Sequence, residues 1–251
     1  GSLENIVFAK YPLLKSINYF FLKRIKYIII SGNSHKSIFK SIKEEKLVIV
    51  PNFAPKNIYI KEHEFNKKYE NIQKIQFLFL SSMEESKGYK DLFDGIEKLP
   101  QEISNLYQFN FAGRFNDFQE EQIFIKKIRG KKNIRFYGFV EEKTKISLFK
   151  KSRIFCLPSK LLEGQPVSIL EAYAAGCAII TTNKPGILDI FKDKTNGYLI
   201  KNKTMKSMVD ILKTIPRNKN NLQNIAFNNL KSANKLYTEN NFCKNIEKLL
   251  N

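Results

Sequence analysis

Tryptophan is absent from this sequence of 251 residues, which contains only three cysteines and two histidines. Cys156, Cys177 and Cys243 are odd in number and lie far apart, which excludes a disulfide framework. Cys156 and Cys177 lie in apolar stretches, so we expect buried free thiols, as in a reducing cytoplasm. His35 and His63 are too few and too isolated to predict a metal site.

Long hydrophobic runs are also absent. No apolar stretch approaches the roughly 20 residues that a membrane-spanning helix needs, and we find no pattern of a signal peptide. We therefore predict a cytoplasmic protein. The chain begins with Gly1 and Ser2 instead of Met, and we interpret this beginning as a cut that removed an upstream segment.

Acidic residues are scarce relative to basic ones. The sequence has 24 Asp and Glu against 43 Lys and Arg, a formal net charge of +19. Such a charge fits nucleic acid or an anionic membrane surface as a partner. No nucleic-acid-binding motif accompanies it, so we expect no nucleic acid partner. Lys, Ile and Asn are abundant throughout, as in proteins from A/T-rich genomes, which weakens the charge as a functional signal.

Apolar runs and helical patterns alternate along the second half of the chain. Such alternation predicts an α/β architecture, a parallel sheet with helices on both faces. Ligands of these sheets bind outside the carboxyl ends of the strands. The expected strands cover residues 75–80, 107–112, 134–137, 154–157, 178–182 and 198–200, and helices are expected near 88–98, 117–128, 141–150, 204–214 and 220–251.

The first part of the chain has shorter patterns. Residues 11–27 carry apolar side chains at helical spacing, and short strands are expected at 28–30 and 47–50. Ser34 can cap a helix over 35–43.

The run from Pro158 to Gly176 is the most informative stretch. Pro158 ends a strand, and Gly164 permits close approach of the backbone to a ligand. Pro166 suits the first position of a helix, and Gly176 suits its end. A helix that opens at the carboxyl end of a strand offers free N–H groups and a positive dipole end to an anion.

Two carboxylates bracket this helix start, Glu163 in the loop and Glu171 in the helix, eight residues later. Backbone amides bind phosphate, and carboxylates accept hydrogen bonds from hydroxyl groups. Together these groups are what a sugar nucleotide requires. The alternative interpretation is an ordinary strand, loop and helix of any α/β domain.

The spacing of Glu163 and Glu171, with Gly164, Pro166 and Gly176 in place, resembles the signature of glycosyltransferase family 4, the glycosyl transferases group 1. The resemblance implies retaining enzymes of the GT-B fold, in which two Rossmann-like domains face each other across a cleft. Their donor is a nucleotide sugar, and no cofactor is implied. The sequence lacks the Asp-x-Asp motif that holds a divalent ion in the other major glycosyltransferase fold, so we expect no metal.

The resemblance also implies a domain organisation. Residues 72–225 resemble a complete nucleotide-sugar-binding domain, and residues 226–251 resemble the terminal helix that packs back toward the first domain. Residues 1–55 resemble a remnant of the amino-terminal, acceptor-binding domain, and a polar linker is expected over 56–71. The expected fold is therefore one Rossmann-like domain plus part of a second.

Family members carry a Lys-Gly pair after the first strand of the donor domain, and Lys87-Gly88 matches it. By resemblance, Lys87 binds the donor phosphates as a point charge, Glu163 holds the sugar hydroxyls and Glu171 binds the ribose. We therefore predict Lys87 and Glu163 as catalytic residues. A solvated loop lysine and an ordinary loop acid are the alternatives.

The other donor contacts are expected at the same strand ends. Where many relatives have Gly-Arg, whose arginine binds phosphate, this chain has two serines ending in Ser82. Either Ser82 is sufficient for this contact, or another cation such as Arg114 contributes to it. By resemblance, the backbone near Gly138 contacts the nucleobase. We assign Gly186 and Asp189 to structure. The predicted donor-binding residues are Glu171, Gly164, Gln165, Pro166, Val167 and Ser168 around the helix start, and Ser82, Arg114, Gly138, Phe139 and Val140 at the neighbouring strand ends.

The resemblance predicts transfer of a sugar from a nucleoside diphosphate sugar, with UDP as the first candidate base, to a glycan or lipid-linked acceptor. Retention of configuration and a role in bacterial surface polysaccharide or glycan synthesis are implied. One alternative is a donor-binding fragment that is inactive without its missing domain or a partner chain. Another is a GT-B epimerase that acts on a UDP-sugar.

Residues 11–27 carry one further expectation. Lys15, Lys23, Arg24 and Lys26 lie among Phe and Leu side chains, as in a helix on an anionic membrane surface. Because many relatives build lipid-linked glycans, we predict peripheral attachment to the inner face of the cell membrane. The alternative is a core helix of the first domain that lacks its partners.

Overall fold

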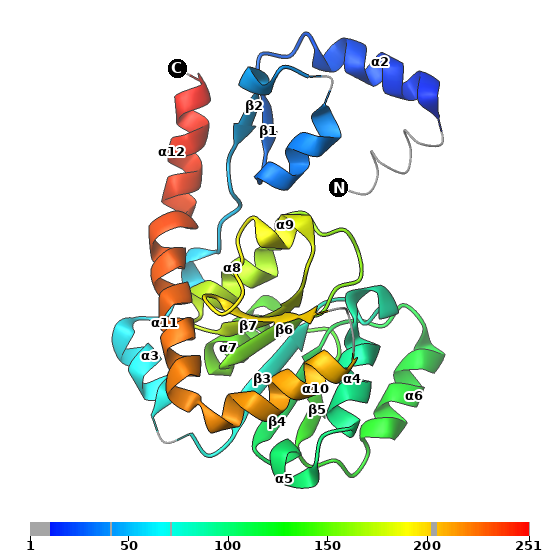
Figure 1. The fold of residues 1–251 in the computed structure, drawn as a ribbon, viewed down its shortest axis with the longest axis vertical. Helices are drawn as coiled ribbons and strands as arrows, with labels where there is room; N and C mark the ends of the chain where they lie inside the picture. Colours follow the sequence, from blue (N-terminus) through cyan, green and yellow to red (C-terminus); the bar gives the residue numbers. More distant parts are fainter. Residues whose placement is uncertain (1–10, 41, 71, 202–204, 251) are drawn as a thin grey trace.

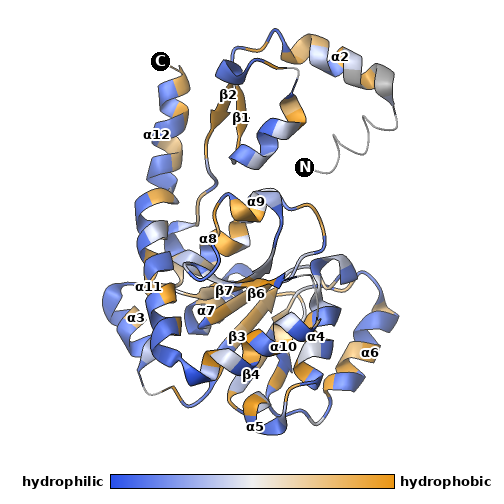
Figure 2. Ribbon diagram, in the orientation of Figure 1, coloured by the Kyte–Doolittle hydropathy of each residue, from blue (hydrophilic) through white to orange (hydrophobic). Residues whose placement is uncertain are grey.

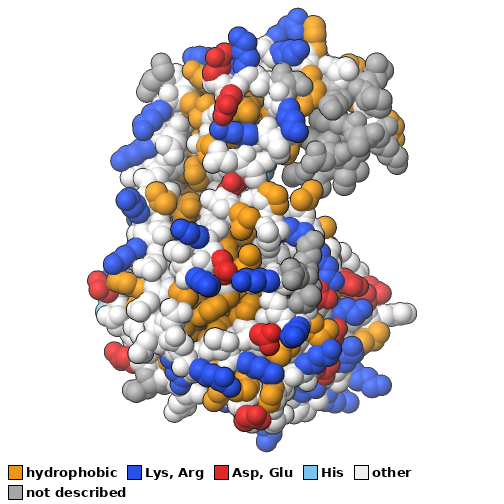
Figure 3. All heavy atoms as spheres, viewed as in Figure 1, with side chains coloured by type: hydrophobic (Ala, Val, Ile, Leu, Met, Phe, Trp, Pro, Cys, Tyr) orange, Lys and Arg blue, Asp and Glu red, His pale blue; other side chains and the backbone are white. Residues whose placement is uncertain are grey.

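The computed structural model describes residues 11–40, 42–70, 72–201 and 205–250. Figure 1 shows a large α/β domain with a smaller amino-terminal part above it, and helix α12 (Glu239–Leu250) rising beside the smaller part. The smaller part contains helix α2 (Pro12–Leu22) and two parallel strands, β1 (Ile28–Ile30) and β2 (Leu47–Ile49). Figure 3 shows the surface indented between the two parts, on the right of the view.

The large domain is built on six parallel strands in the order β5-β4-β3-β6-β7-β8. The order reverses between β3 and β6, and open α/β sheets bind ligands at such a reversal. The sheet confirms the predicted architecture. Its strands are β3 (Ile75–Leu80), β4 (Tyr107–Ala112), β5 (Ile134–Phe136), β6 (Ile154–Leu157), β7 (Ala178–Thr182) and β8 (Gly197–Ile200).

Helices cover both faces of this sheet. Phe77 and Phe79 of β3 pack with α4, α6 and α10 on one face, and Leu78 packs with α7 and α8 on the other. Strands covered on both faces are largely apolar, as Figure 2 shows for β3 and β6. The helices are α4 (Tyr89–Glu97), α5 (Gln101–Ser104), α6 (Phe118–Ile128), α7 (Glu142–Lys151), α8 (Val167–Ala174), α9 (Pro185–Leu188) and α10 (Met205–Thr214).

Helix α11 (Lys219–Leu236) is joined to the sheet by the fully buried side chain of Asn229. Its Nδ2 donates hydrogen bonds to the carbonyl oxygens of Cys177 (2.8 Å) and Asn196 (2.9 Å). The described part of the segment 220–251 is helical, as expected, and it is divided into two helices. Thr238 Oγ1 accepts a hydrogen bond from the Asn241 amide (3.2 Å) and so caps α12.

The segment expected to be a polar linker carries regular structure that the sequence analysis did not predict. Residues 56–70 contain a 3-10 turn and helix α3 (Glu62–Tyr69), and Phe65 and Tyr69 of this helix are buried. Lys68 Nζ donates to the carbonyl oxygen of Ala175 (2.7 Å) at the end of α8, where a cation is favourable. The apolar residues of α3 are four positions apart among charged ones, and this spacing was the missed signal.

The helix expected over 35–43 is a 3-10 helix, Asn33–Phe39, and Ser34 does not cap it. The Ser34 hydroxyl donates instead to Asp189 Oδ2 (2.6 Å) of the large domain. This contact supports the structural role assigned to Asp189.

The thiols of Cys156 and Cys177 are buried and free, as predicted, and burial raises the pKa of both. Across the described ranges, no helix combines the length and the apolar character needed to cross a bilayer.

Candidate active site

The carboxyl ends of β3, β4 and β5 pack directly against one another. The Ser81 amide donates to the carbonyl oxygen of Ala112 (3.2 Å), and the Gly113 amide donates to that of Gly138 (2.8 Å). A Cβ at Gly113, where φ is +151°, would lie 1.8 Å from the Ser81 carbonyl oxygen. Only glycine fits there. Because the three strand ends are bonded to one another, the predicted donor residues that follow them share one edge of the sheet.

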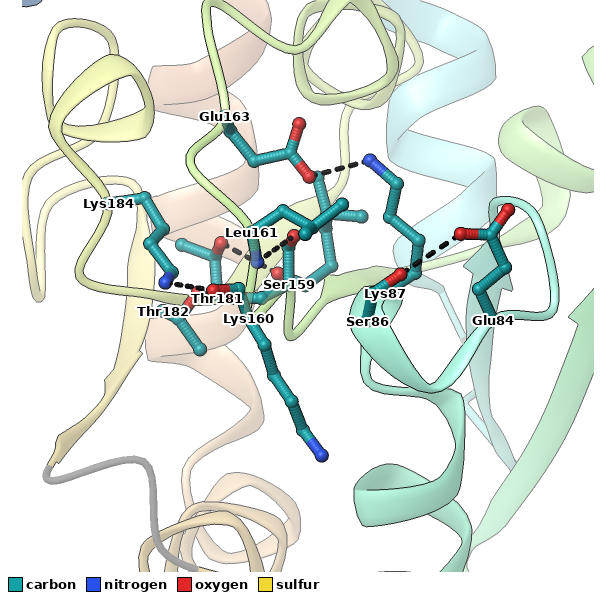
Figure 4. Close-up of polar contacts among 11 residues, drawn as sticks. Glu84, Ser86, Lys87, Ser159, Lys160, Leu161, Glu163, Thr181, Thr182 and Lys184 are labelled. Carbon is teal, nitrogen blue, oxygen red and sulfur yellow. Dashed lines mark hydrogen bonds and ion pairs between the residues drawn. The ribbon is translucent and has the colours of Figure 1, made fainter. Parts of the chain in front are cut away.

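The loop that joins β6 to α8 is held from two sides, and Figure 4 shows the bonds on the side of Thr182 and Lys184. On one side the Lys160 amide donates to the carbonyl oxygen of Ser86 (2.8 Å). On the other side Thr182 Oγ1 donates to the carbonyl oxygen of Ser159 (2.6 Å), and Lys184 Nζ donates to that of Lys160. These bonds link the loop to the ends of its neighbours in the sheet.

Two glycines let the neighbouring backbone come close to this loop. Gly88 has a φ of +82°, and a Cβ there would lie 2.2 Å from the carbonyl oxygen of Pro158. A Cβ at Gly186 would lie 1.9 Å from the carbonyl oxygen of Gly164 and 2.4 Å from that of Glu163. No side chain fits at either glycine without moving the loop.

The clamped loop directs Glu163 at Lys87. Lys87 Nζ and Glu163 Oε1 are 2.8 Å apart, and their side chains are 23% and 13% exposed. Lys87 lies in a 3-10 turn after β3, and Glu163 lies in the loop after β6. These two strands are neighbours at the point where the strand order of the sheet reverses. The structure thus brings together the two residues predicted to be catalytic (Figure 4).

Helix α8 begins one residue later than predicted. Pro166 is its N-cap rather than its first helical residue, and it provides no side-chain hydrogen bond to the first turn. The Ile169 amide donates to the carbonyl oxygen of Pro166 (3.1 Å). The amides of Val167 and Ser168 precede it at the helix start, which is a favourable place for an anion. The helix ends at Gly176, φ +64°, as predicted.

Glu171 lies inside α8 and is paired with a lysine that the sequence analysis missed. Lys145 Nζ of α7 is 2.6 Å from Glu171 Oε1, and the Glu171 side chain is only 6% exposed. A buried carboxylate needs such a partner. Nothing in the local sequence marks Lys145, because the pair depends on how α7 packs beside α8.

Gln165 was predicted to bind a donor through its backbone, and its side chain forms hydrogen bonds to the smaller part of the protein. The Asn52 amide donates to Gln165 Oε1 (2.5 Å), and Gln165 Nε2 donates to the carbonyl oxygen of Ser31 (2.8 Å). The loop is therefore bonded to the ends of both strands of the smaller part. Nothing in the sequence alone pairs these distant positions.

His35 also lies at this loop, although the sequence marked it only as isolated. A Cβ built on Gly164 would lie 3.3 Å from His35 Nε2. His35 Nδ1 is buried and has no hydrogen-bond partner among the described residues. The smaller part thus places an imidazole against the residue that follows Glu163.

The remaining predicted residues share the edge, but among the described residues none of them forms a side-chain hydrogen bond or ion pair with Lys87 or Glu163. Ser82 is half-buried, and the exposed Arg114 guanidinium has no ion-pair or hydrogen-bond partner within the described chain. Phe139 is 74% exposed, and Val140 packs on the core beneath. The described residues include no group of three His, Cys, Asp or Glu side chains arranged to hold a metal.

Solved structures with the same fold are GT-B glycosyltransferases. HepE from Anabaena, solved in complex with UDP and glucose, superposes with a TM-score of 0.74 at 15% identity, over 94% of this chain and 66% of HepE. WaaG, a glycosyltransferase involved in lipopolysaccharide biosynthesis, superposes with a TM-score of 0.68 at 16% identity, over 83% of this chain and 59% of WaaG. The protein therefore has the GT-B type of fold.

Sequence comparison identifies the family. The family model for glycosyl transferases group 1 matches residues 60–232, and the chain belongs to this family. It is 28% identical to the capsular polysaccharide biosynthesis glycosyltransferase CapH of Staphylococcus aureus, over 88% of this chain and 59% of CapH. It is 27% identical to an N-acetylgalactosaminyltransferase of Campylobacter jejuni that acts on a diphosphoundecaprenol-linked glycan, over 72% of this chain and 49% of that enzyme. The chain thus spans about half the length of these relatives.

Gly186→Ala tests the clamp on the Glu163 loop. The added Cβ, 1.9 Å from the Gly164 carbonyl oxygen, forces the loop or α9 to move. We expect urea denaturation to show a loss of about 1–3 kcal/mol in the free energy of unfolding. The control Gly95→Ala places its Cβ 3.3 Å from the flexible Met208 side chain, inside α4, and should be neutral or stabilising. Equal stability of the two variants would refute the clamp.

Proposed function

We propose that this chain is the donor-binding part of a retaining glycosyltransferase of family 4. The observation that carries the proposal is the Lys87–Glu163 pair, held at 2.8 Å beside the start of α8. Opposite charges at the carboxyl edge of a parallel sheet suit a ligand that has both a diphosphate and sugar hydroxyls.

The proposed reaction breaks the bond between the anomeric carbon and the diphosphate oxygen and forms a bond from that carbon to an acceptor hydroxyl oxygen, whose proton passes to the departing diphosphate. Negative charge then develops on the leaving group, and preorganised donors that face this charge lower the barrier. Lys87 and the amides of Gly164, Val167 and Ser168 would supply those donors. Glu163 would hold the sugar hydroxyls so that the anomeric carbon faces the acceptor.

Glu171 would bind the ribose of the donor, and its ion pair with Lys145 orients the carboxylate in a buried place. The exposed ring of Phe139, beside Gly138 and Val140, is available to flank a base at the same edge. Ser82 and Arg114 would supply the phosphate contacts of the missing arginine. UDP is the proposed base, supported by the UDP complex of HepE.

The proposed acceptor is a glycan or a lipid-linked glycan, in the synthesis of a bacterial surface polysaccharide. The names of the relatives from S. aureus and C. jejuni support this class. We propose residues 72–225 as the donor domain, residues 1–55 as part of the acceptor domain, with 56–71 between them, and residues 226–251 as the returning helix. Because the chain spans about half of its relatives, the acceptor side would need further residues or a partner chain.

Calorimetric titration of the chain with UDP, GDP and ADP tests the donor site. We expect one diphosphate, UDP, to bind, and we expect Lys87→Ala and Glu171→Gln each to weaken binding by about tenfold or more, since each removes a charge-assisted hydrogen bond. The control Lys90→Ala removes an exposed lysine at the start of α4, three residues after Lys87, and should leave the affinity unchanged. Binding of all three nucleotides with no effect of either substitution would contradict the proposed site.

Retention is tested on the product of the full-length enzyme. We expect the new linkage to keep the anomeric configuration of the donor, which NMR coupling constants of the anomeric proton report. A product of inverted configuration would exclude the family 4 mechanism, even if UDP binds as proposed.

We further propose that the protein acts in the cytoplasm, attached peripherally to the inner face of the cell membrane. Helix α2 supports this proposal, because Ile17, Phe20 and Phe21 are 48%, 54% and 60% exposed. Lys23 and Arg24 follow them at the end of the helix. An exposed apolar stripe flanked by cations suits an anionic lipid surface.

Liposome co-sedimentation tests the attachment. At low salt we expect the protein to pellet with vesicles that contain phosphatidylglycerol, and to remain in solution with phosphatidylcholine vesicles, because the interaction needs both apolar burial and charge. Phe20→Ser with Phe21→Ser should abolish pelleting. The control Phe118→Ser removes a 73% exposed phenylalanine from α6 and should have no effect.

A further inference from the structure

A polar groove lies on the large domain away from the candidate active site. It has a volume of about 1030 Å³, just above the range of about 300–1,000 Å³ for small-molecule sites. Gln76 and Gln108 of its floor are register partners near the amino ends of β3 and β4. Ser82 follows Gln76 by six residues along an extended strand, roughly 20 Å at 3.3 Å per residue. The groove is therefore separate from the candidate active site at the carboxyl ends of the strands.

The excess of basic over acidic residues is larger around the groove than in the chain as a whole. Its lining includes seven Lys or Arg residues and one acid, Glu64, whereas the whole chain has 43 basic and 24 acidic residues. Glu64 is engaged locally, because its Oε2 accepts a hydrogen bond from the Lys61 amide. Within the described ranges, no carboxylate pairs with Arg135, Lys151 or Arg153.

Charge alone would be weak evidence, since Figure 3 shows Lys and Arg side chains spread over the face it displays. The second observation concerns buried polar atoms. Gln108 Nε2 and Arg153 Nε are buried and have no hydrogen-bond partner among the described residues. Both atoms are donors, and leaving a donor unsatisfied costs about 1–3 kcal/mol. Both residues line the groove, so a ligand rich in acceptor oxygens would satisfy these donors once the two side chains turn toward it.

The floor of the groove is already ordered. Asn110 Nδ2 donates to the Phe77 carbonyl oxygen (3.1 Å) and to Gln76 Oε1 (3.3 Å), and the Tyr137 hydroxyl donates to Asn110 Oδ1 (3.4 Å). Amide and phenol groups in a fixed array can bind the hydroxyl groups of a sugar ring, because they both donate and accept hydrogen bonds. The groove thus combines neutral polar groups below with cations around its rim.

We propose that this groove binds an acidic oligosaccharide, whose carboxylate or phosphate groups meet the rim cations and whose hydroxyls meet the floor. A flat lipid surface fits less well, because the site is concave and its lining contains no exposed Leu, Ile, Val or Phe. The neutral floor distinguishes the site from a plain anion patch. The proposal stands independently of the proposed donor site, since the two share no residue.

Titration with tetragalacturonic acid, beside neutral maltotetraose, tests the groove. We expect the acidic tetrasaccharide to bind and the neutral one to bind at least tenfold more weakly. The double variant Arg135→Gln with Lys151→Gln removes two exposed rim cations and should weaken the acidic ligand about tenfold, or about 1.4 kcal/mol. UDP binding should be unchanged in this variant, which separates failure of the groove from failure of the donor site.

The matched control is Lys126→Gln with Arg129→Gln, an exposed Lys and Arg at the end of α6 outside the groove. It should change the affinity less than twofold. An equal loss in both double variants would overturn the proposal in favour of general charge attraction. Tight binding of phosphatidylglycerol vesicles or of a single-stranded oligonucleotide, lost in the groove variant while tetragalacturonic acid fails to bind, would also overturn it.

Discussion

The rest of the site depends on the close packing of one loop, residues 158–166, between two glycines. Gly88 and Gly186 bring neighbouring backbone so near that no side chain fits in between. Because the backbone of this loop is confined on both sides, its conformation orients Glu163, sets where α8 starts and positions Gln165. The candidate chemistry and the attachment of the smaller part are therefore consequences of the same constraint, and a change in one displaces the other.

Acidic groups are few in this basic chain, and the two that matter most are each paired with one lysine from another element. Burying a carboxylate is costly unless a cation and hydrogen bonds accompany it. The pairs Lys87–Glu163 and Lys145–Glu171 meet that condition without a ligand. Each lysine fixes the direction of the carboxylate that it contacts, so both acids are oriented before any ligand is present.

Patterns that involve neighbouring residues were predictable from sequence. Runs such as 154–157 and 178–182 are mainly apolar because both faces of the sheet are covered. The helix ends at Gly176 because this residue adopts a positive φ, which glycine permits. Helix α3 was missed because its many charged residues resemble a linker, although its buried face follows helical spacing. Ser34 was misassigned because a hydroxyl that can cap a local helix bonded instead to Asp189, a partner 155 positions away.

By itself, the sequence determined the α/β class, which follows from periodicity. It also contained the residues around Glu163 and Glu171 that resemble the glycosyl transferases group 1, a family that the comparison then identified. Only the tertiary structure decided that Lys87 meets Glu163, that Lys145 neutralises Glu171 and that a polar groove lies beside β4. The physical reason is that parallel strands meet through long crossover connections. Which side chains become neighbours then depends on how whole helices pack, and no local stretch of sequence contains that information.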